Sequence, residues 1–183
     1  MELQQKLLTG IDVKDKLARE FKRFSFVIAG GAVRDSVLDK PISDIDMYTS
    51  LPIHTDRNFI KKLVSFFPTA KKIYRMSIDQ YHRWHSVAIE MSDGTEIQLI
   101  HMPTTPVIKT IMNFDIGLCM CYLSTAENKL ILPEEFKRDR DNKTLTVYPD
   151  RLSSSQIVRS FEYHLPKLLK KYPDYQPRVK YDE

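Results

Sequence analysis

The chain has few cysteines, few glycines and no long apolar run. Its 183 residues include two cysteines and five glycines. No stretch reaches the roughly 18 consecutive apolar residues of a membrane span, and the first residues lack the apolar core of a signal peptide. These absences predict a protein without a membrane segment that works in the cytoplasm.

The two cysteines, Cys119 and Cys121, suit neither a local disulfide nor a usual zinc pair. They stand two residues apart in an apolar run, 116–123, whose composition predicts a buried strand. At that spacing on one strand they lack the geometry of a bonded pair. We interpret both as small core residues in a reducing compartment.

The positive charge of the chain is concentrated at its C-terminal end. The net charge is +4, with 42% hydrophobic and 28% charged residues, which is ordinary for a globular protein of one domain with or without an appendage. Residues 151–183 hold seven Lys/Arg and four Asp/Glu, a surplus of three positive charges. Such a segment suits a polyanionic partner such as RNA, although solvated helix faces are often as basic. We expect one domain over 1–150, followed by a basic helix and tail over 151–183.

The hydrophobic pattern predicts a mixed α/β (α+β) fold, with a partly antiparallel sheet flanked by helices and a C-terminal helix. Helices are predicted over 13–24, 32–38, 56–67 with Asp56 as cap, 104–112 and 156–171, the last interrupted at Pro166. Strands are predicted over 25–29, 45–49, 71–76, 85–91, 95–102 and 144–148, with a hairpin of 115–124 and 129–132. Residues 133–143 read as charged and irregular, and the tail as extended.

The most informative segment joins a glycine turn to two carboxylates. An apolar strand runs into Gly30-Gly31, a short helix follows, and the chain returns as a strand carrying Asp44 and Asp46. Because side chains alternate along a strand, both aspartates point to one face and Ile45 to the other. Two unpaired carboxylates would repel each other and raise each pKa, whereas a divalent metal removes that penalty. The pattern therefore predicts a metal site.

The glycines and the arginine that follows them suit a triphosphate. Without Cβ atoms, Gly30 and Gly31 let phosphate approach the backbone, and the N–H groups of the following helix point at the anion. Arg34, one turn into that helix, can add a charge-assisted fork. We expect Asp35 to orient Arg34 or to cap the turn rather than to bind metal.

This combination suggests in-line phosphoryl transfer with two Mg²⁺ ions about 4 Å apart. A third carboxylate would complete the site, and Glu90 and Glu96 are the candidates, on opposite arms of the hairpin around Ser92–Gly94. A two-residue turn would place Glu90 opposite Ile97, so that the two glutamates face opposite sides. We choose Glu96, because Gln98, on the same face, is also polar.

These residues resemble the head-domain signature of the DNA polymerase beta-type nucleotidyltransferase superfamily. Gly-Gly-Ala-Val-Arg-Asp followed by Lys-Pro-Ile-Ser-Asp-Ile-Asp is most similar to class II CCA-adding enzymes and poly(A) polymerases, over roughly residues 25–124. The resemblance implies that Gly31 and Arg34 contact the nucleotide and that Asp44 and Asp46 bind metal. The family's Glu-Val-Thr-type strand is similar to Glu96-Ile97-Gln98, which supports Glu96.

The chain also departs from that family. The family's Arg-Arg-Asp-Phe-Thr-Ile-Asn-Ala motif corresponds to residues 113–120, where Asp115 remains and both arginines are absent. Asp39 stands where a glycine is usual. Residues 157–161 resemble the start of the family's neck, which makes Arg159, like Asp115, a candidate nucleotide ligand. A chain of 183 residues leaves no room for the helical domains that hold tRNA, so we do not expect a full CCA-adding enzyme.

We therefore expect a minimal nucleotidyltransferase, similar to small bacteriophage proteins of this type. It would use Mg²⁺ to move a nucleoside monophosphate from an NTP to an acceptor hydroxyl and release pyrophosphate. The acceptor would be an RNA or tRNA 3′ end, bound through the basic C-terminal helix, or a protein or small molecule. If a phage encodes it, the compartment is the host cytoplasm. The alternative is a nucleotide-binding or regulatory module that has lost turnover.

Overall fold

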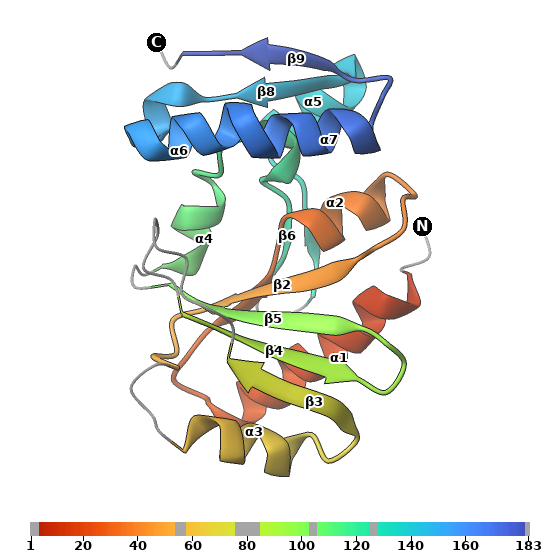
Figure 1. Cartoon of the computed structure of the whole chain (residues 1–183), viewed down its shortest axis with the longest axis vertical. Helices are drawn as coiled ribbons and strands as arrows, with labels where there is room; N and C mark the ends of the chain where they lie inside the picture. Colours follow the sequence, from red (N-terminus) through yellow and green to blue (C-terminus); the bar gives the residue numbers. More distant parts are fainter. Residues whose placement is uncertain (1–3, 54–57, 76–84, 103–105, 125–127, 182–183) are drawn as a thin grey trace.

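A five-stranded sheet organises the N-terminal part of the molecule (Figure 1). The computed structural model describes residues 4–53, 58–75, 85–102, 106–124 and 128–181. In spatial order the strands are β1 (Phe26–Ile28), β2 (Asp44–Thr49), β5 (Glu96–His101), β4 (Ser86–Met91) and β3 (Ala70–Arg75). β2 and β5 are parallel and the other neighbours are antiparallel, as the predicted mixed sheet requires.

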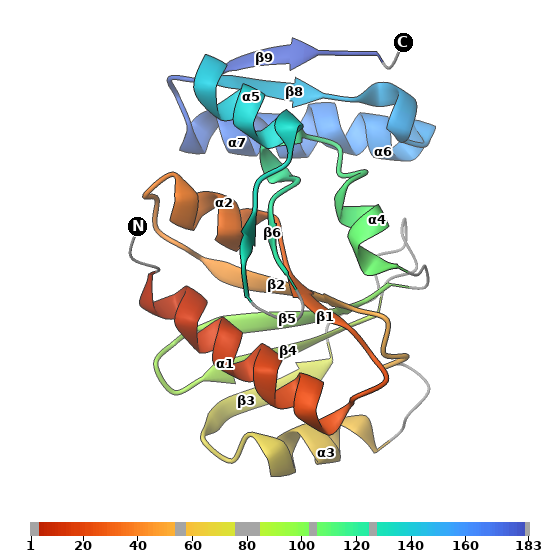
Figure 2. The ribbon, with the colours of Figure 1, turned by 180° about the vertical axis from the view of Figure 1, so that it is seen from behind.

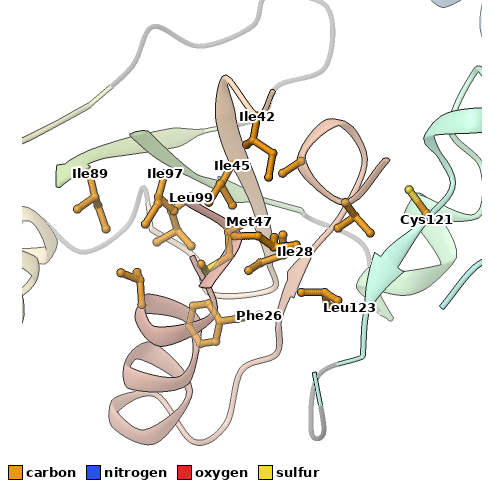
Figure 3. Close-up of a cluster of buried hydrophobic side chains, with 14 of the residues drawn as sticks. Phe26, Ile28, Ile42, Ile45, Met47, Ile89, Ile97, Leu99, Cys121 and Leu123 are labelled. Atoms are coloured by element: carbon orange, nitrogen blue, oxygen red, sulfur yellow. The ribbon is translucent and has the colours of Figure 1, made fainter. Parts of the chain in front are cut away.

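One face of the sheet is closed by helices. α1 (Gln5–Glu20) crosses this face, as Figure 2 shows, and begins and ends earlier than predicted. It approaches β2 so closely that a Cβ on Gly10 would lie 2.7 Å from Cδ1 of Ile45. α3 (Phe59–Phe66) lies beside β3, and its predicted cap, Asp56, lies outside the described residues. Figure 3 shows the resulting core, in which Ile45, Met47, Ile97 and Leu99 of β2 and β5 are fully buried.

The opposite face of β2 and β5 is polar at the end that carries Asp44, Asp46 and Gln98, and apolar at the other end, where Tyr48 and Ile100 belong to a second buried cluster. α2 (Gly31–Val37) and α4 (Val107–Ile111) lie toward this side, between the sheet and the C-terminal helices in Figure 1. Between α2 and β2, Asp39 has φ +53°, a backbone conformation that favours glycine and that aspartate tolerates. The glycine usual at this position in the similar family thus corresponds to a real backbone requirement.

The segment 115–124 is not the long strand that its composition suggests. A 3₁₀ turn occupies Gly117–Cys119, and only β6 (Tyr122–Leu123) is extended, paired with β7 (Leu130–Ile131). Gly117 packs against Asp139, where a Cβ would lie 2.7 Å from a carboxylate oxygen. That contact belongs to a distant part of the sequence, and strand propensity alone does not reveal it.

The segment 133–143 is helical rather than irregular. α5 (Glu134–Asn142) follows Pro133, has acidic residues in its first turn, and ends at Lys143 with φ +52°. These are ordinary helix-boundary signals. Only Phe136 and Asp139 are buried, so the helix has no apolar stripe that a periodicity argument could detect.

The C-terminal helix lies on the side of the five-stranded sheet that carries the two aspartates, and a two-stranded parallel sheet lies on the far side of this helix, at the top of Figure 1. That sheet consists of β8 (Thr144–Val147) and β9 (Gln176–Val179). The helix comprises α6 (Ser154–Arg159), a π-helical turn Ser160–His164, and α7 (Leu165–Lys171). The predicted irregularity at Pro166 takes the form of a π-helical turn directly before it and not of a break in the helix, because proline offers no N–H to the carbonyl four residues earlier.

No helix in the described residues is long and apolar enough to cross a membrane. The division of the chain at residue 150 remains a prediction.

Candidate active site

A cavity of about 500 Å³ lies between the polar face of the sheet and the C-terminal helix. Every predicted site residue except Glu96 lines it: Gly30, Gly31, Arg34, Asp44, Asp46, Asp115 and Arg159. The structure thus brings together residues from both ends of the sequence.

The two aspartates lie at alternate positions of β2, as predicted, with Ile45 buried on the other side. Asp44 accepts hydrogen bonds from Oγ of Ser43 and from Nε2 of Gln98 at 3.3 Å. Burial and repulsion from Asp44 raise the pKa of Asp46 to about 7, although Lys167 and Arg34 oppose the shift. The carboxylate of Asp46 is therefore held in an environment that disfavours its charge.

The predicted register of the hairpin is wrong. Glu90 pairs with Glu96, so the two glutamates lie on the same side of the sheet. The connecting turn is longer than two residues: the N–H of Met91 donates to the carbonyl of Thr95, and the N–H of Gly94 donates to that of Met91. The extra residue shifts the pairing by one position and moves the partner to the other face.

The parallel pairing of β2 with β5 gives a different reason to prefer Glu96 over Glu90 as the third carboxylate. It lies opposite Asp44, whereas Glu90 is one strand further away and forms an ion pair with Lys71 at 2.7 Å. Glu96 does not line the cavity, and its oxygens accept hydrogen bonds from Tyr74 at 3.1 Å and Gln98 at 3.1 Å. Its role as a third metal ligand stays a prediction.

The glycine turn has the backbone geometry expected of it. Gly30 has φ +70°, and its N–H donates to the carbonyl of Cys121 at 2.9 Å. Its carbonyl accepts the N–H of Arg34 at 2.9 Å. A side chain at Gly30 would be strained, and a Cβ there would lie 3.6 Å from the ring of Phe114.

Arg34 is fixed by a buried network. Its guanidinium contacts Asp35 at 2.7 Å and donates to the hydroxyl of Tyr172 at 3.0 Å and to Sγ of Cys119 at 3.1 Å. Burial opposes the charge, but Cys119 and Asp35 outweigh it and raise the pKa of Arg34. The expected contact between Asp35 and Arg34 is confirmed. Cys119 is a half-buried cavity residue rather than part of a core strand.

The C-terminal helix supplies cations that the sequence argument did not assign to the site. Lys171 forms an ion pair with Asp35, and Lys167 lines the cavity close enough to lower the pKa of Asp46. The spacing of His164, Lys167 and Lys171 places their side chains on one side of a helix. This spacing is the sequence signal that could have identified them as residues facing the cavity.

Asp115, which lies between α4 and the 3₁₀ turn, is hydrogen-bonded to the C-terminal helix. Its Oδ2 accepts hydrogen bonds from Oγ of Ser160 at 2.5 Å and from Nδ1 of His164 at 2.7 Å. Burial raises the pKa of Asp115, but the bonds from His164 and Ser160 outweigh it and lower the pKa below its usual value.

An aromatic pair forms another part of the lining. Phe114 stands where the similar family has arginine, and its ring lies 5.5 Å from that of Tyr48, centroid to centroid. Tyr48 follows Asp44 and Asp46 at alternate positions of β2, so acidic and aromatic side chains share one face.

The two carboxylates of Asp44 and Asp46 offer the oxygen ligands that Mg²⁺ prefers, but they are too few to hold the ion without further ligands from a substrate. Within the described ranges, no group of three or more His, Cys, Asp or Glu could hold a metal ion. Mg²⁺ is commonly bound by one or two carboxylates together with water and substrate phosphates. The raised pKa of Asp46 fits such an ion, because a divalent cation would stabilise the disfavoured charge.

The comparison with solved structures shows the nucleotidyltransferase fold of CCA-adding enzymes. A CCA-adding enzyme solved with ATP is 15% identical (TM-score 0.67), with 96% of this chain and 40% of that chain covered. The Thermotoga maritima CCA-adding enzyme complexed with tRNA is 18% identical (TM-score 0.65), covering 97% and 40%. A tRNA-processing enzyme in an apo form is 14% identical (TM-score 0.66), covering 97% and 45%. The chain spans less than half the length of these structures.

The likeness in fold extends beyond residues 25–124 and includes the C-terminal helix, because nearly the whole chain is covered. A comparison with curated protein sequences gives no match. The model of the Gabija anti-defense 2 (Gad2) family, a phage anti-defence family, matches residues 2–143. The chain therefore belongs to the Gabija anti-defense 2 family.

Proposed function

We propose that this protein is a Mg²⁺-dependent nucleotidyltransferase that moves a nucleoside monophosphate from an NTP to an acceptor hydroxyl and releases pyrophosphate. The observation that carries the proposal is the convergence of Asp44, Asp46 and the Gly30-Gly31 turn in one cavity. The cations of the C-terminal helix close that cavity from the other side, which suits a polyanionic substrate.

Each part of the cavity has a distinct task in this proposal. Asp44 and Asp46 would hold Mg²⁺ with help from the phosphates of the substrate, and the glycine turn would let the triphosphate approach the backbone. When bound, Mg²⁺ neutralises charge that develops on the phosphoryl oxygens. Lys167 and Arg159 line the same cavity from the helix, and they would contact the phosphates from that side. Glu96, if its hydrogen bonds rearrange, completes the carboxylate set.

The aromatic pair provides a surface for the nucleoside. Tyr48 and Phe114 line the cavity beyond Asp46, and aromatic rings stack on nucleobases without requiring one base. The acceptor is an RNA 3′ end, a protein hydroxyl or a small molecule, with the basic residues around α6 and α7 suited to RNA. We propose that this transfer is how the protein acts against Gabija defence.

Nucleotide transfer can be tested with each NTP labelled at the α-phosphate, Mg²⁺, and RNA or lysate from the host bacterium. We expect label to enter an acceptor, and the Asp44→Ala/Asp46→Ala variant to transfer none. Lysate without the protein gives the background. Transfer that survives the double substitution would refute the assignment of the aspartates.

The anti-defence role needs a separate measurement. In bacteria carrying Gabija, phage infection should recover when the unsubstituted protein is expressed and should stay blocked with the double variant. Recovery with both proteins would show that nucleotide transfer is not the means.

A binding module without turnover is the second candidate. It is favoured by Asn113 and Phe114 in place of two arginines, and by the two-carboxylate metal set. Such a protein would bind NTP in the same cavity. NTP binding in calorimetry, with no label transferred to host RNA or lysate, would identify it.

A further inference from the structure

His164 lines the cavity but has no part in the function proposed above. It is the last residue of the π-helical turn Ser160–His164, and its side chain is 41% exposed to solvent. Single π-turns within α-helices are frequent at functional sites. Here the turn places an imidazole in the lining of the cavity that the two aspartates of β2 also line.

The bond to Asp115 fixes which nitrogen of His164 is available. Nδ1 lies 2.7 Å from Oδ2 of Asp115, and an ionised carboxylate only accepts hydrogen bonds. Nδ1 therefore carries a proton, which leaves the lone pair of the neutral imidazole on Nε2. Among the described residues, Asp115 is the only hydrogen-bond partner of the His164 side chain. Nε2 of His164 is thus an oriented proton acceptor that a ligand in the cavity can contact.

The carboxylate chosen from the sequence is less well placed for this task. Both oxygens of Glu96 accept hydrogen bonds, from Tyr74 and Gln98, and Glu96 is absent from the cavity lining. His164 is in the lining, and the hydrogen bond from Ser160 to Asp115 steadies the carboxylate that orients it. The arrangement is that of an aspartate holding a histidine for proton transfer.

We propose that His164 is the general base for the acceptor hydroxyl, with Asp115 as its positioning residue; this rests on the proposed nucleotidyl transfer. The hydroxyl oxygen forms a bond to the α-phosphorus while its proton passes to Nε2 of His164. The bond from the α-phosphorus to the bridging oxygen breaks, and pyrophosphate leaves with that electron pair. His164 then returns the proton to water.

The test compares His164→Ala with the unsubstituted protein, using α-phosphate-labelled NTP and host lysate as the acceptor source. General base catalysis predicts a rate of transfer lower by about 100- to 10,000-fold. Affinity for an NTP analogue with a methylene between the α- and β-phosphorus should be unchanged. Added imidazole should restore part of the rate, which it could not do for a folding defect.

Two further variants separate proton transfer from structure. Asp115→Asn should slow transfer and respond less to imidazole, because His164 is still present but misoriented. Glu162→Gln is the matched control: Glu162 lies in the same π-turn, is exposed and does not line the cavity, so transfer should be unchanged.

The outcomes distinguish this proposal from the one on which it rests. Undiminished transfer by His164→Ala, or a loss that imidazole does not relieve, overturns the role of His164 alone. Absence of transfer by the unsubstituted protein overturns the proposed function and this assignment with it.

Discussion

Among single residues, the Asp44–Asp46 pair lowers the stability of the metal-free protein when both carboxylates are ionised. Asp46 is deeply buried beside a second carboxylate, and burial and that neighbour raise its pKa to about 7. In an unfolded chain the carboxyl pKa is about 3.9. The folded state thus binds this proton more tightly, and the penalty of ionising Asp46 grows as pH rises from about 4 to about 7.

This penalty predicts that Asp46→Asn stabilises the metal-free protein while abolishing transfer. At mildly alkaline pH the free energy of unfolding should rise by on the order of 2 kcal/mol, because the neutral amide removes the buried charge. Urea unfolding with a chelator measures the change. The gain should vanish in acid, where Asp46 is protonated in both states; a gain independent of pH would contradict the account.

The pKa of Asp115 is shifted in the direction opposite to that of Asp46. Burial raises its pKa, but hydrogen bonds from His164 and Ser160 outweigh it and lower the pKa. Its contribution to stability is therefore present above the unfolded pKa of about 3.9 and is lost as pH falls through the lower, folded value.

We accordingly expect Asp115→Asn to lower the free energy of unfolding near neutral pH by about 1–3 kcal/mol. Below about pH 4 the difference from the unsubstituted protein should begin to shrink, because the unfolded chain binds the proton first, and it should be lost once the pH falls below the lower pKa of folded Asp115. Denaturant midpoints at the two pH values measure it. An equal difference at both would mean that the carboxylate charge does not contribute.

At the level of helices and strands, local sequence patterns predicted the glycine turn and the aspartate pair, but not the long-range contacts that bend the chain elsewhere. The β1–α2–β2 segment could be predicted because strand alternation and glycine conformation are local properties. The 3₁₀ turn at Gly117 depends on Asp139, which is distant in sequence. The hairpin register depended on one extra turn residue, and α5 buries too little apolar surface to show a helical period.

Asp139 illustrates such a long-range requirement. Fully buried, it accepts hydrogen bonds from the hydroxyl of Thr144 at 2.9 Å and from the N–H of Thr146 at 3.0 Å. Asp139→Ala would leave these donors unpaired and should lower the free energy of unfolding by about 3 kcal/mol. Chemical denaturation measures the change. Asp141→Ala, on the exposed side of α5, is the control and should change little.

At the scale of the whole molecule, the head and the C-terminal segment share both a core and a site. Leu168 and Tyr172 are buried in the same hydrophobic cluster as β1 and β2. Tyr172 also donates a hydrogen bond to Asp35, and Lys171 pairs with Asp35. The predicted boundary at residue 150 therefore cuts through interactions that hold Arg34 in place.

We expect a chain of residues 1–150 to fold poorly or to unfold at a clearly lower temperature than the full chain. It would lose the partner of β8, the apolar residues of α7 and one wall of the cavity. Thermal unfolding followed by circular dichroism measures this. Equal melting of the two chains would show that the head is independent of the C-terminal segment.

Nucleotidyl transfer can be distinguished from other uses of the NTP by following two labels in parallel reactions. With Mg²⁺ and host lysate, one reaction carries NTP labelled at the α-phosphate and the other NTP labelled at the γ-phosphate. We predict that the α-label enters an acceptor while the γ-label leaves as pyrophosphate, and that Asp44→Ala/Asp46→Ala does neither. Transfer of the γ-label to the acceptor, or NTP binding with no transfer of either label, would contradict the account.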